Sequence, residues 1–369
     1  MKVAIAHDYL TQRGGAERVV LSLCRAFPNA AVHTLLFDPK STFPEFESVD
    51  VRVSPLNRVG VIRRNHRLGL PVMPLAASLM RIDADVVVAS SSGWSHGFAV
   101  PNSTKKLVYC HNPPRWVYQT SEYLGGSAGG LANIVARSAR TPLRRWDRAK
   151  AATVDLYLAN STVVSKRISC AYGVDAEILF PPVALRAEPR ASAGFVANLA
   201  GQPFFLCVSR LLPYKNVDRV IGAAERVGVR VVVVGAGPER ARLSGLVTGR
   251  TSLLSGLSDS ELCWLYANCS AVVGASYEDF GLTPIEGAFF GKPAVVLGRG
   301  GYLDTVIDGV TGIHVPSPDI ADLAAGMVES LGRPWDSGSI RAHAERFSED
   351  HFIDVVRERA ASLFSGLYD

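Results

Sequence analysis

The sequence has 369 residues, which is enough for two ordinary domains with complete hydrophobic cores. Hydrophobic residues make up 48% of the chain and charged residues 20%, and the apolar runs are short and broken by Gly, Pro or charge, so the composition indicates a soluble globular protein and excludes a transmembrane helix. The net charge of +5 is unevenly spread, because residues 1–183 carry 22 Lys and Arg against 13 Asp and Glu, and the remainder carries 17 against 21. A basic first half predicts an anionic partner. An anionic membrane surface or a phosphate-bearing lipid fits better than nucleic acid, because no aromatic stacking platform accompanies the basic residues.

The amino terminus and the cysteines bear on the cellular compartment. The opening M-K-V-A-I-A-H-D has only four consecutive apolar residues before His7, too few for a signal peptide. The six cysteines form no C-x-x-C pair. Five of them lie in or beside apolar runs, namely Cys110, Cys170, Cys207, Cys263 and Cys269. This pattern favours buried thiols in a reducing cytosol over a zinc site or a disulfide framework.

The chain opens with an apolar strand at Val3–Ala6, a loop that ends in Gly14-Gly15, and a helix predicted from about Ala16 to Phe27. This is how a doubly wound α/β domain begins, and glycines at a helix start let backbone amides approach a phosphate group. Many such loops contain glycines, so a plain turn is the alternative. Glu17 is expected to be a first-turn residue favoured by the helix dipole.

Two basic segments follow in the first half. From Arg58 to Arg81 basic and apolar residues alternate, and a second segment, residues 137–150, surrounds Trp146 with arginines. The arginines concerned are Arg58, Arg63, Arg64 and Arg67 in the first segment and Arg140, Arg144, Arg145 and Arg148 in the second. Such segments would press onto anionic headgroups at about 1 kcal/mol per cation. A solvated basic face over an ordinary core is the alternative.

Two further strands of the first half end in polar residues. Asp85–Ala89 runs into Ser90-Ser91-Ser92-Gly93, and small polar residues at the carboxyl end of a strand are typical of the ligand crevice of an open α/β sheet. Leu107–Cys110 is followed directly by His111. A lone histidine is more often structural than catalytic, but its place at the carboxyl edge of a central strand favours a role in a site. A strand at Leu156–Ala159 is expected to close this domain.

A second α/β series follows a linker that runs through Pro181-Pro182 to Ala193. Its first strand is predicted at Phe204–Val208, with Arg210 at the strand end and Lys215 at the mouth of the next helix. There both cations can converge on phosphate, Arg as a fork and Lys as a point charge. Two solvated surface cations are the alternative.

The next strand, Val231–Val234, ends in Gly235-Ala236-Gly237, which begins like a dinucleotide fingerprint. Arg240 stands where the third glycine belongs and Pro238 breaks the helix start, so a NAD site is rejected. We expect Gly235 to let the backbone approach a nucleotide closely. A strand at Leu253–Leu257 is expected to end with Leu257 packed on the base.

The stretch from Gly274 to Glu286 reads G-A-S-Y-E-D-F-G-L-T-P-I-E and joins a predicted strand, Ala271–Gly274, to a helix. The helix is expected to start at Thr283-Pro284, with Thr283 as N-cap and Gly291 at its end.

Two carboxylates, Glu278 and Glu286, flank this junction. The amides of Gly281, Leu282 and Thr283 between them are not paired within the helix and form an anion site. The arrangement suits a nucleotide-sugar, which has hydroxyls at both ends and phosphate in the middle. In the alternative, Glu286 forms a capping box with Thr283 and Glu278 is a solvated turn residue.

Glu-x7-Glu with an inner F-G-L-T-P-I-E resembles the donor-site motif of the retaining glycosyltransferases of family 4, which have the GT-B fold. G-G-A-E after the first strand, H-N-P-P-R-W at His111 and S-R-L-L-P-Y-K-N extend the resemblance over nearly the whole chain. The H-x-P-P-R-W form looks most like the branch that uses GDP-mannose to build surface polysaccharides.

The resemblance implies two Rossmann-like doubly wound domains that face each other across a cleft, with a C-terminal helix that returns to the first domain. The implied boundaries are 1–183 for the acceptor domain, 184–346 for the nucleotide-sugar domain and 347–369 for the returning helix. That helix is expected from about Glu349 to Phe364.

The same resemblance implies the roles of individual residues. Glu278 would contact the donor sugar, Glu286 the nucleotide ribose, and His111 would lie against the sugar and the reacting centre. Arg210 and Lys215 would bind the diphosphate, which completes the implied catalytic set. The implied donor-binding residues are Gly14, Gly15, Arg210, Lys215, Gly235, Leu257, Phe280, Gly281, Leu282, Thr283 and Glu286.

The implied reaction is retaining transfer of a sugar, best matched by mannose from GDP-mannose, to a glycan acceptor that is linked to a lipid diphosphate such as a polyprenyl diphosphate. Cations and amides would stabilise the leaving group, so no metal or other cofactor is expected. The expected location is cytoplasmic, with peripheral attachment to the inner face of the plasma membrane. An epimerase of the same fold and a non-catalytic sugar-nucleotide binding protein are the alternatives.

Overall fold

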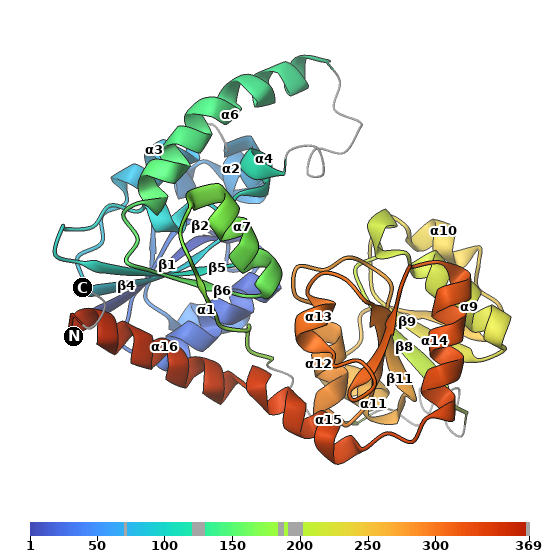
Figure 1. Cartoon of the computed structure of the whole chain (residues 1–369). Helices are drawn as coiled ribbons and strands as arrows, with labels where there is room; N and C mark the ends of the chain where they lie inside the picture. The colour runs from blue at the N-terminus through green and yellow to red at the C-terminus, as the bar shows by residue number, and fades with distance from the viewer. Residues whose placement is uncertain (70–71, 120–129, 184–187, 191–201, 367–369) are drawn as a thin grey trace. The chain divides into compact units, whose positions relative to one another are not determined.

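The computed structural model describes residues 1–69, 72–119, 130–183, 188–190 and 202–366. The chain divides into two compact units, which we call unit 1, Met1–Pro182 with Glu349–Asp369, and unit 2, Val183–Ser348. Each unit is built on one parallel β-sheet (Figure 1). Much of the predicted linker, at 184–187 and 191–193, falls outside the described residues.

The sheet of unit 1 has the strand order β3-β2-β1-β4-β5-β6-β7, and its neighbouring strands are parallel. The strands are β1 Val3–Leu10, β2 Val32–Phe37, β3 Val51–Val53, β4 Val86–Ser91, β5 Lys105–Cys110, β6 Leu156–Ala159 and β7 Glu177–Ile178. The chain order reverses between β1 and β4. In open α/β sheets ligands bind at such a switch point, outside the carboxyl ends of the strands.

Helices cover both faces of this sheet, as parallel strands require. They are α1 Gly15–Ala26, η1 Pro44–Ser48, η2 Pro55–Arg58, α2 Gly60–Arg64, η3 His66–Gly69, α3 Met73–Leu79, η4 Ser95–Gly97, α4 Arg115–Tyr118, α6 Gly130–Ala151, α7 Thr162–Tyr172 and α16 Glu349–Phe364. Helices α1 and α16 pack on one face, and α3, α6 and α7 on the other (Figure 1). Successive side chains of a strand point to opposite faces of the sheet. On β1, Ile5 packs in the core beneath α1 and α16, whereas Ala4 and Ala6 pack in the core beneath α3, α6 and α7.

Helix α16 returns to unit 1, as the resemblance implies. Phe352, Val356 and Leu363 are buried against α1 and the sheet. At the start of the helix, the buried Glu349 carboxylate accepts hydrogen bonds from Ser22 and Arg25 on α1. The Arg357 Nε donates to the Ala26 carbonyl oxygen at 2.8 Å.

The sheet of unit 2 has the order β10-β9-β8-β11-β12-β13, again with parallel neighbours. The strands are β8 Phe204–Val208, β9 Arg230–Val234, β10 Thr251–Leu254, β11 Ala271–Gly274, β12 Ala294–Leu297 and β13 Gly312–Val315. The helices are η6 Pro213–Lys215, α9 Val217–Val227, α10 Arg240–Ser244, α11 Asp259–Asn268, α12 Leu282–Phe289, α13 Tyr302–Thr305, α14 Ile320–Gly332, α15 Ser337–Ala344 and η7 Glu345–Phe347. In chain order this is the 3-2-1-4-5-6 arrangement of Rossmann domains, with the switch point between β8 and β11.

Several predicted strand ends differ from the structure. Strand β1 continues to Leu10, and β4 includes Ser90 and Ser91, whereas the predicted strand ended at Ala89. Both extensions arise because backbone pairing continues there, with His7 opposite Ser90 in the neighbouring strand. Strand β10 ends at Leu254, so Leu257 lies beyond it.

Candidate functional site

The carboxyl edge of the unit 2 sheet gathers most of the predicted site residues. Arg210 and Lys215 follow β8, Gly235 follows β9, Leu257 follows β10, and residues 276–286 follow β11. Arg210 is exposed, and no hydrogen bond or ion pair of its guanidinium is found among the described residues. It is therefore a cation at the switch point that no described carboxylate neutralises.

Lys215 and Glu278 form an ion pair at this edge, with both side chains largely buried. The Ser276 hydroxyl donates to the same Glu278 oxygen, and the Lys215 ammonium lies 5.1 Å from the centre of the Tyr214 ring. The pair joins the end of β8 to the end of β11, so two predicted catalytic residues are in direct contact. The solvated-turn alternative for Glu278 is therefore wrong.

The loop that carries Glu278 is held by glycines after β12. The Gly301 amide donates to the Glu278 carbonyl oxygen at 2.8 Å. A Cβ atom at Gly301 would overlap the backbone of Asp279 and Phe280. These glycines therefore support the Glu278 loop.

The amino terminus of α12 differs from the prediction. The helix begins at Leu282, and Gly281, not Thr283, is the N-cap, so the capping-box alternative is also wrong. Gly281 has a φ of 92°, and a Cβ atom there would lie 2.6 Å from the Tyr302 ring, so the position requires glycine. The Thr283 hydroxyl donates to the Val208 carbonyl oxygen at 3.3 Å. Within the described part of the chain the amides of Leu282 and Thr283 have no hydrogen-bond acceptor, which leaves donors for an anion.

Glu286 lies on the second turn of α12 and accepts a hydrogen bond from the Tyr266 hydroxyl. Burial, together with the Glu286 carboxylate, raises the pKa of Tyr266 well above its ordinary value. The hydroxyl therefore remains a donor and fixes one carboxylate oxygen of Glu286.

The glycines after β9 have a structural role that the sequence interpretation missed. A Cβ atom at Gly235 would overlap the Ser209 carbonyl oxygen, and one at Gly237 would overlap the Leu211 backbone. The Leu211 amide donates to Ala236 O at 2.9 Å. The β8–α9 loop therefore requires glycine at both positions, and the close approach of a nucleotide to the Gly235 backbone stays a prediction.

The side chains of two other predicted donor-binding residues, Phe280 and Leu257, pack into the core of unit 2. Phe280 is buried, with its ring centre 5.8 Å from that of Phe347, so only its backbone is left for a ligand. Leu257 is partly buried against the core that contains Val234 and Tyr266.

In unit 1, Gly14 is the N-cap of α1 and Gly15 its first residue. Glu17 is in the first turn, as predicted, but it is buried, and its Oε2 has no hydrogen-bond partner among the described residues. A Cβ atom at Gly14 would lie 2.6 Å from that oxygen. The carboxylate beneath Gly14 lowers the attraction of this helix end for phosphate, and the binding of the diphosphate by Gly14 and Gly15 stays a prediction.

His111 lies at the end of β5 and is held from both sides. Its amide donates to Ser91 O at 2.9 Å, and Asn160 Nδ2 donates to its carbonyl oxygen at 3.1 Å. Its Nε2 is 2.7 Å from the Ser90 hydroxyl. Burial, and then the nearby charge of His7, lower the pKa of His111 to about 3. The imidazole is therefore neutral at physiological pH.

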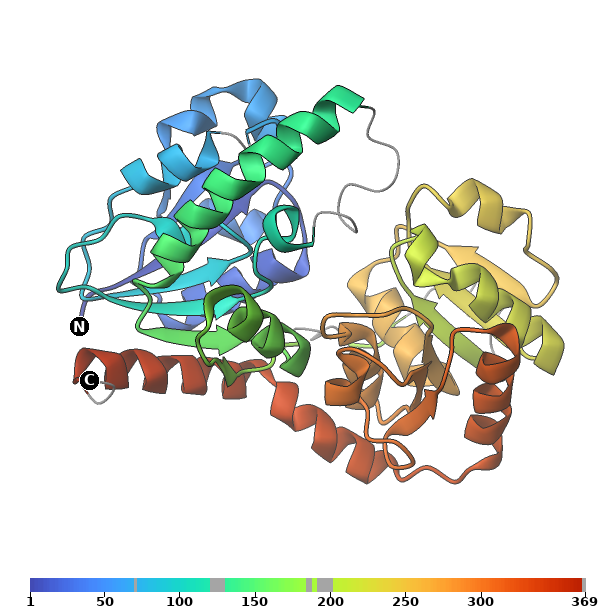
Figure 2. The ribbon, with the colours of Figure 1, turned by 45° about the horizontal axis from the view of Figure 1, so that its top comes forward.

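The basic segments of unit 1 form a mixed surface. Arg58, Arg64 and Arg81 are exposed, Arg63 is half-buried, and the side chains of Arg67 and Arg137 lie outside the described set. Between them large apolar side chains are exposed, namely Val59, Val61, Leu68, Val72, Leu75 and Leu79. We call these exposed residues of 58–81 the α2–α3 surface. Helix α6 lies beside it (Figure 2), and Trp146 Nε1 donates to Ser78 on α3 at 3.0 Å.

Other features of the described residues bear on metals, membranes and thiols. They contain no group of three or more His, Cys, Asp or Glu side chains arranged to hold a metal ion. In the same ranges no helix is both long and apolar enough to span a bilayer. None of the six cysteines, all of which lie among the described residues, forms a disulfide, and Cys170 is exposed, contrary to the expectation of burial.

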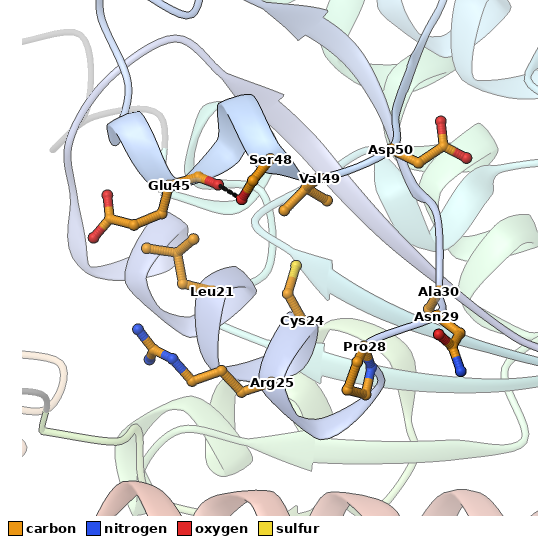
Figure 3. A pocket seen from close by; sticks show the side chains of 10 residues that line it. All are labelled: Leu21, Cys24, Arg25, Pro28, Asn29, Ala30, Glu45, Ser48, Val49 and Asp50. Atoms are coloured by element: carbon orange, nitrogen blue, oxygen red, sulfur yellow. Dashed lines mark hydrogen bonds between the residues drawn. The ribbon is translucent and has the colours of Figure 1, made fainter.

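A cavity of about 590 Å³ lies at the opposite edge of the unit 1 sheet (Figure 3). It is lined by the last turns of α1, by η1 and by the residues just before β2 and β3, with Arg25, Glu45 and Asp50 as its charged groups. It contains none of the predicted site residues and lies away from the carboxyl edge, where α/β domains bind ligands.

Sequence reasoning missed several residues that support the site. His7 and Ser90 approach His111, Tyr266 holds Glu286, and Asn216 donates from Nδ2 to Ala275 O at 2.9 Å. Asn216 has a φ of 52° and is the N-cap of α9. Asn216 could have been found from the sequence, because it directly follows Lys215 in the predicted cation motif. The contacts of His7, Ser90 and Tyr266 could not, because they depend on how distant parts of the chain pack together.

Comparison with known proteins places these units in one class. Residues 13–184 match the model "Glycosyltransferase Family 4", and residues 194–346 match "Glycosyl transferases group 1". Anabaena Alr3699/HepE in complex with UDP shares the fold, with a TM-score of 0.70 and 17% identity over 98% of this chain and all of that chain. The protein is thus a glycosyltransferase with the GT-B fold.

Two curated relatives are mannosyltransferases. "Alpha-1,3/1,6-mannosyltransferase ALG2" of Dictyostelium discoideum is 22% identical over 95% of this chain and 94% of its own length. The "GDP-mannose-dependent alpha-mannosyltransferase" of Mycobacterium tuberculosis is 28% identical over 73% and 74% respectively. The chain belongs to glycosyltransferase family 4, as its motifs indicated.

Proposed function

We propose that the protein is a retaining α-mannosyltransferase that moves mannose from GDP-mannose to a glycan acceptor carried on a lipid diphosphate, in polysaccharide or glycolipid biosynthesis. The observation that carries the proposal is the unit 2 switch point. There an unneutralised Arg210, the Lys215–Glu278 pair and the open amides of α12 follow two adjacent strands. The choice of mannose is supported by relatives that are named as mannosyltransferases, and the choice of GDP by those whose names specify GDP-mannose.

In this proposal the positive groups of unit 2 act on the leaving group. The bond between the sugar C1 and the diphosphate oxygen breaks, and charge develops on the diphosphate. Arg210, Lys215 and the amides of Leu282 and Thr283 stabilise that charge without a metal ion. A leaving-phosphate oxygen accepts the proton of the acceptor hydroxyl as the new glycosidic bond forms on the same face.

The carboxylates and His111 position the donor. Glu278 accepts hydrogen bonds from sugar hydroxyls, and Glu286, fixed by Tyr266, accepts from the ribose. His111 is neutral, so it offers a hydrogen bond to the sugar without adding a charge.

We further propose that the α2–α3 surface holds the enzyme on the inner face of an anionic membrane, where a lipid-linked acceptor is found. Its exposed leucines and valines would enter the headgroup region while its arginines contact lipid phosphates.

A donor screen tests the proposed reaction. GDP-mannose should raise the melting temperature more than UDP- or ADP-sugars, and mannose transfer should require an acceptor. Stabilisation by a UDP-sugar alone would overturn the donor assignment. Turnover of the donor sugar without an acceptor would identify an epimerase.

The role of Arg210 is tested by comparison with Arg250, a second exposed arginine of unit 2. We expect Arg210→Ala to lower kcat by about 10²–10³-fold, as for loss of one preorganised group that stabilises developing charge. Its melting temperature should stay unchanged, because the side chain has no partner among the described residues. Arg250→Ala should keep full activity. Equal activity of the two variants would remove the cationic diphosphate site from the mechanism.

A further inference from the structure

A line of polar side chains crosses three adjacent strands at the switch point of unit 1. His7 on β1 lies with its Nδ1 3.0 Å from the Ser90 carbonyl oxygen and 3.1 Å from the Ser90 hydroxyl on β4. The same hydroxyl lies 2.7 Å from Nε2 of His111, just after β5. His7 is 2% exposed and Ser90 is fully buried. Ser90 therefore bridges two histidines where water does not compete.

The hydrogen-bond types in this line fix the position of each proton. A carbonyl oxygen only accepts, so Nδ1 of His7 must carry a hydrogen and share it between the two Ser90 oxygens. The Ser90 hydroxyl then accepts from His7, and its own hydrogen is left to donate to Nε2 of His111. Because His111 is neutral, its remaining proton lies on Nδ1.

Neighbouring groups leave this assignment intact. The Ser90 carbonyl oxygen also accepts from the Ser95 hydroxyl at 2.9 Å. The Asp8 carboxylate accepts from the amides of residues 92, 94 and 95 and does not contact either imidazole. Tyr109 lies edge-on to His111, and its hydroxyl donates to Leu179 O. No described residue accepts from Nδ1 of His111, which leaves that donor for a ligand.

We propose that Ser90 and His7 are positioning residues that hold His111 as its Nδ1–H tautomer, so that it presents a hydrogen-bond donor to a hydroxyl oxygen of the transferred sugar. The tautomer assignment stands on the geometry of unit 1, whereas the role toward the sugar rests on the proposed function.

The tautomer is measured directly by long-range ¹H–¹⁵N NMR on the full chain with ¹⁵N-labelled histidine, and His111→Gln assigns the signal. The unaltered protein should show a protonated Nδ1 and an unprotonated, hydrogen-bonded Nε2 at His111. The opposite tautomer would overturn the proposal without any variant. Ser90→Ala should move the Nε2 signal toward a mixture of tautomers, and Ser90→Thr, which keeps the hydroxyl, should restore it.

A matched control and a kinetic readout separate positioning from packing. Ser95→Ala removes an equally buried hydroxyl of the same cluster and should leave the His111 spectrum unchanged. Ser90→Ala should lower kcat for transfer about tenfold with little change in donor KM, in keeping with the loss of one oriented hydrogen bond. An unchanged spectrum in Ser90→Ala overturns the positioning role. A changed spectrum with full activity in both Ser90→Ala and His111→Gln overturns the role of His111 in transfer and leaves the tautomer assignment standing.

Discussion

At the residue scale, burial decides the protonation of His111 before any ligand binds. An isolated histidine titrates near 6.5, whereas the folded chain lowers the pKa of His111 to about 3. Desolvation is the main cause, because the imidazolium would lose its water, and the nearby His7 adds repulsion. The neutral form is thus part of the folded structure.

This shift predicts a pH dependence of stability. Between about pH 6.5 and 3 the unfolded state binds a proton at His111 that the folded state does not, so stability falls as the pH falls through that window, by up to about 1.4 kcal/mol per pH unit. His111→Gln should flatten part of this slope in urea unfolding followed by tryptophan fluorescence. His33 and His343, whose pKa values are also lowered by burial, contribute to the slope that remains. An unaltered slope in His111→Gln would contradict the burial argument.

The sequence was enough to predict which residues belong to the site, but not which of them contact one another. Arg210, Lys215 and Glu278 were found because they follow predicted strands, and parallel strands bring their carboxyl ends to one edge. The Lys215–Glu278 pair spans 63 positions and the His7–Ser90 contact spans 83, so both depend on strand order and register. Nothing local in the sequence encodes either contact.

At the scale of elements, the β8–α9 loop shows how the backbone can explain a motif. Gly235 and Gly237 look like nucleotide-binding glycines, yet their missing side chains make room for residues 209–211. That loop ends in Lys215 and in Asn216, which caps α9 in a left-handed conformation. The strands, α1 and α16 were predicted well because their apolar patterns are local. The cap of α12 was not, since the clash that demands glycine at 281 comes from Tyr302, which lies 21 positions away.

Gly235→Ala tests this account of the loop. Its added methyl would overlap the Ser209 carbonyl oxygen, so the loop must shift, and we expect a loss of about 1–3 kcal/mol, as for other overpacked sites. Amide hydrogen exchange should rise in β8 and β9, and donor affinity should fall. Gly249→Ala is the control, because its Cβ would meet no atom within 4 Å. Equal exchange in the two variants would show that the loop does not need glycine at 235.

At the scale of the whole molecule, the distribution of charge depends on which unit holds α16. Counted to residue 183, the first half has an excess of nine cations. Residues 349–369 bring two arginines and five acidic residues to unit 1, which reduces its excess to six. The remaining positive charge is more local than the sequence alone suggested, and the α2–α3 surface combines it with exposed apolar side chains. That combination is what an anionic bilayer attracts, whereas net charge alone would not distinguish it from other anions.

The proposed membrane surface makes two separable predictions for sedimentation with phosphatidylglycerol vesicles. Leu75 and Leu79 are 65% and 68% exposed, so Leu75→Ser with Leu79→Ser should weaken binding at least about tenfold at any salt concentration, because the loss is apolar. Replacing Arg58, Arg64 and Arg81 with Ser should weaken binding mainly at low salt, where their charge is least screened. Leu303→Ser, at 57% exposed in unit 2, is the matched control and should bind as the unaltered protein does. Binding that survives both sets of substitutions would make this face ordinary protein surface. The acceptor would then have to reach the enzyme from solution, while the donor site in unit 2 would be unaffected.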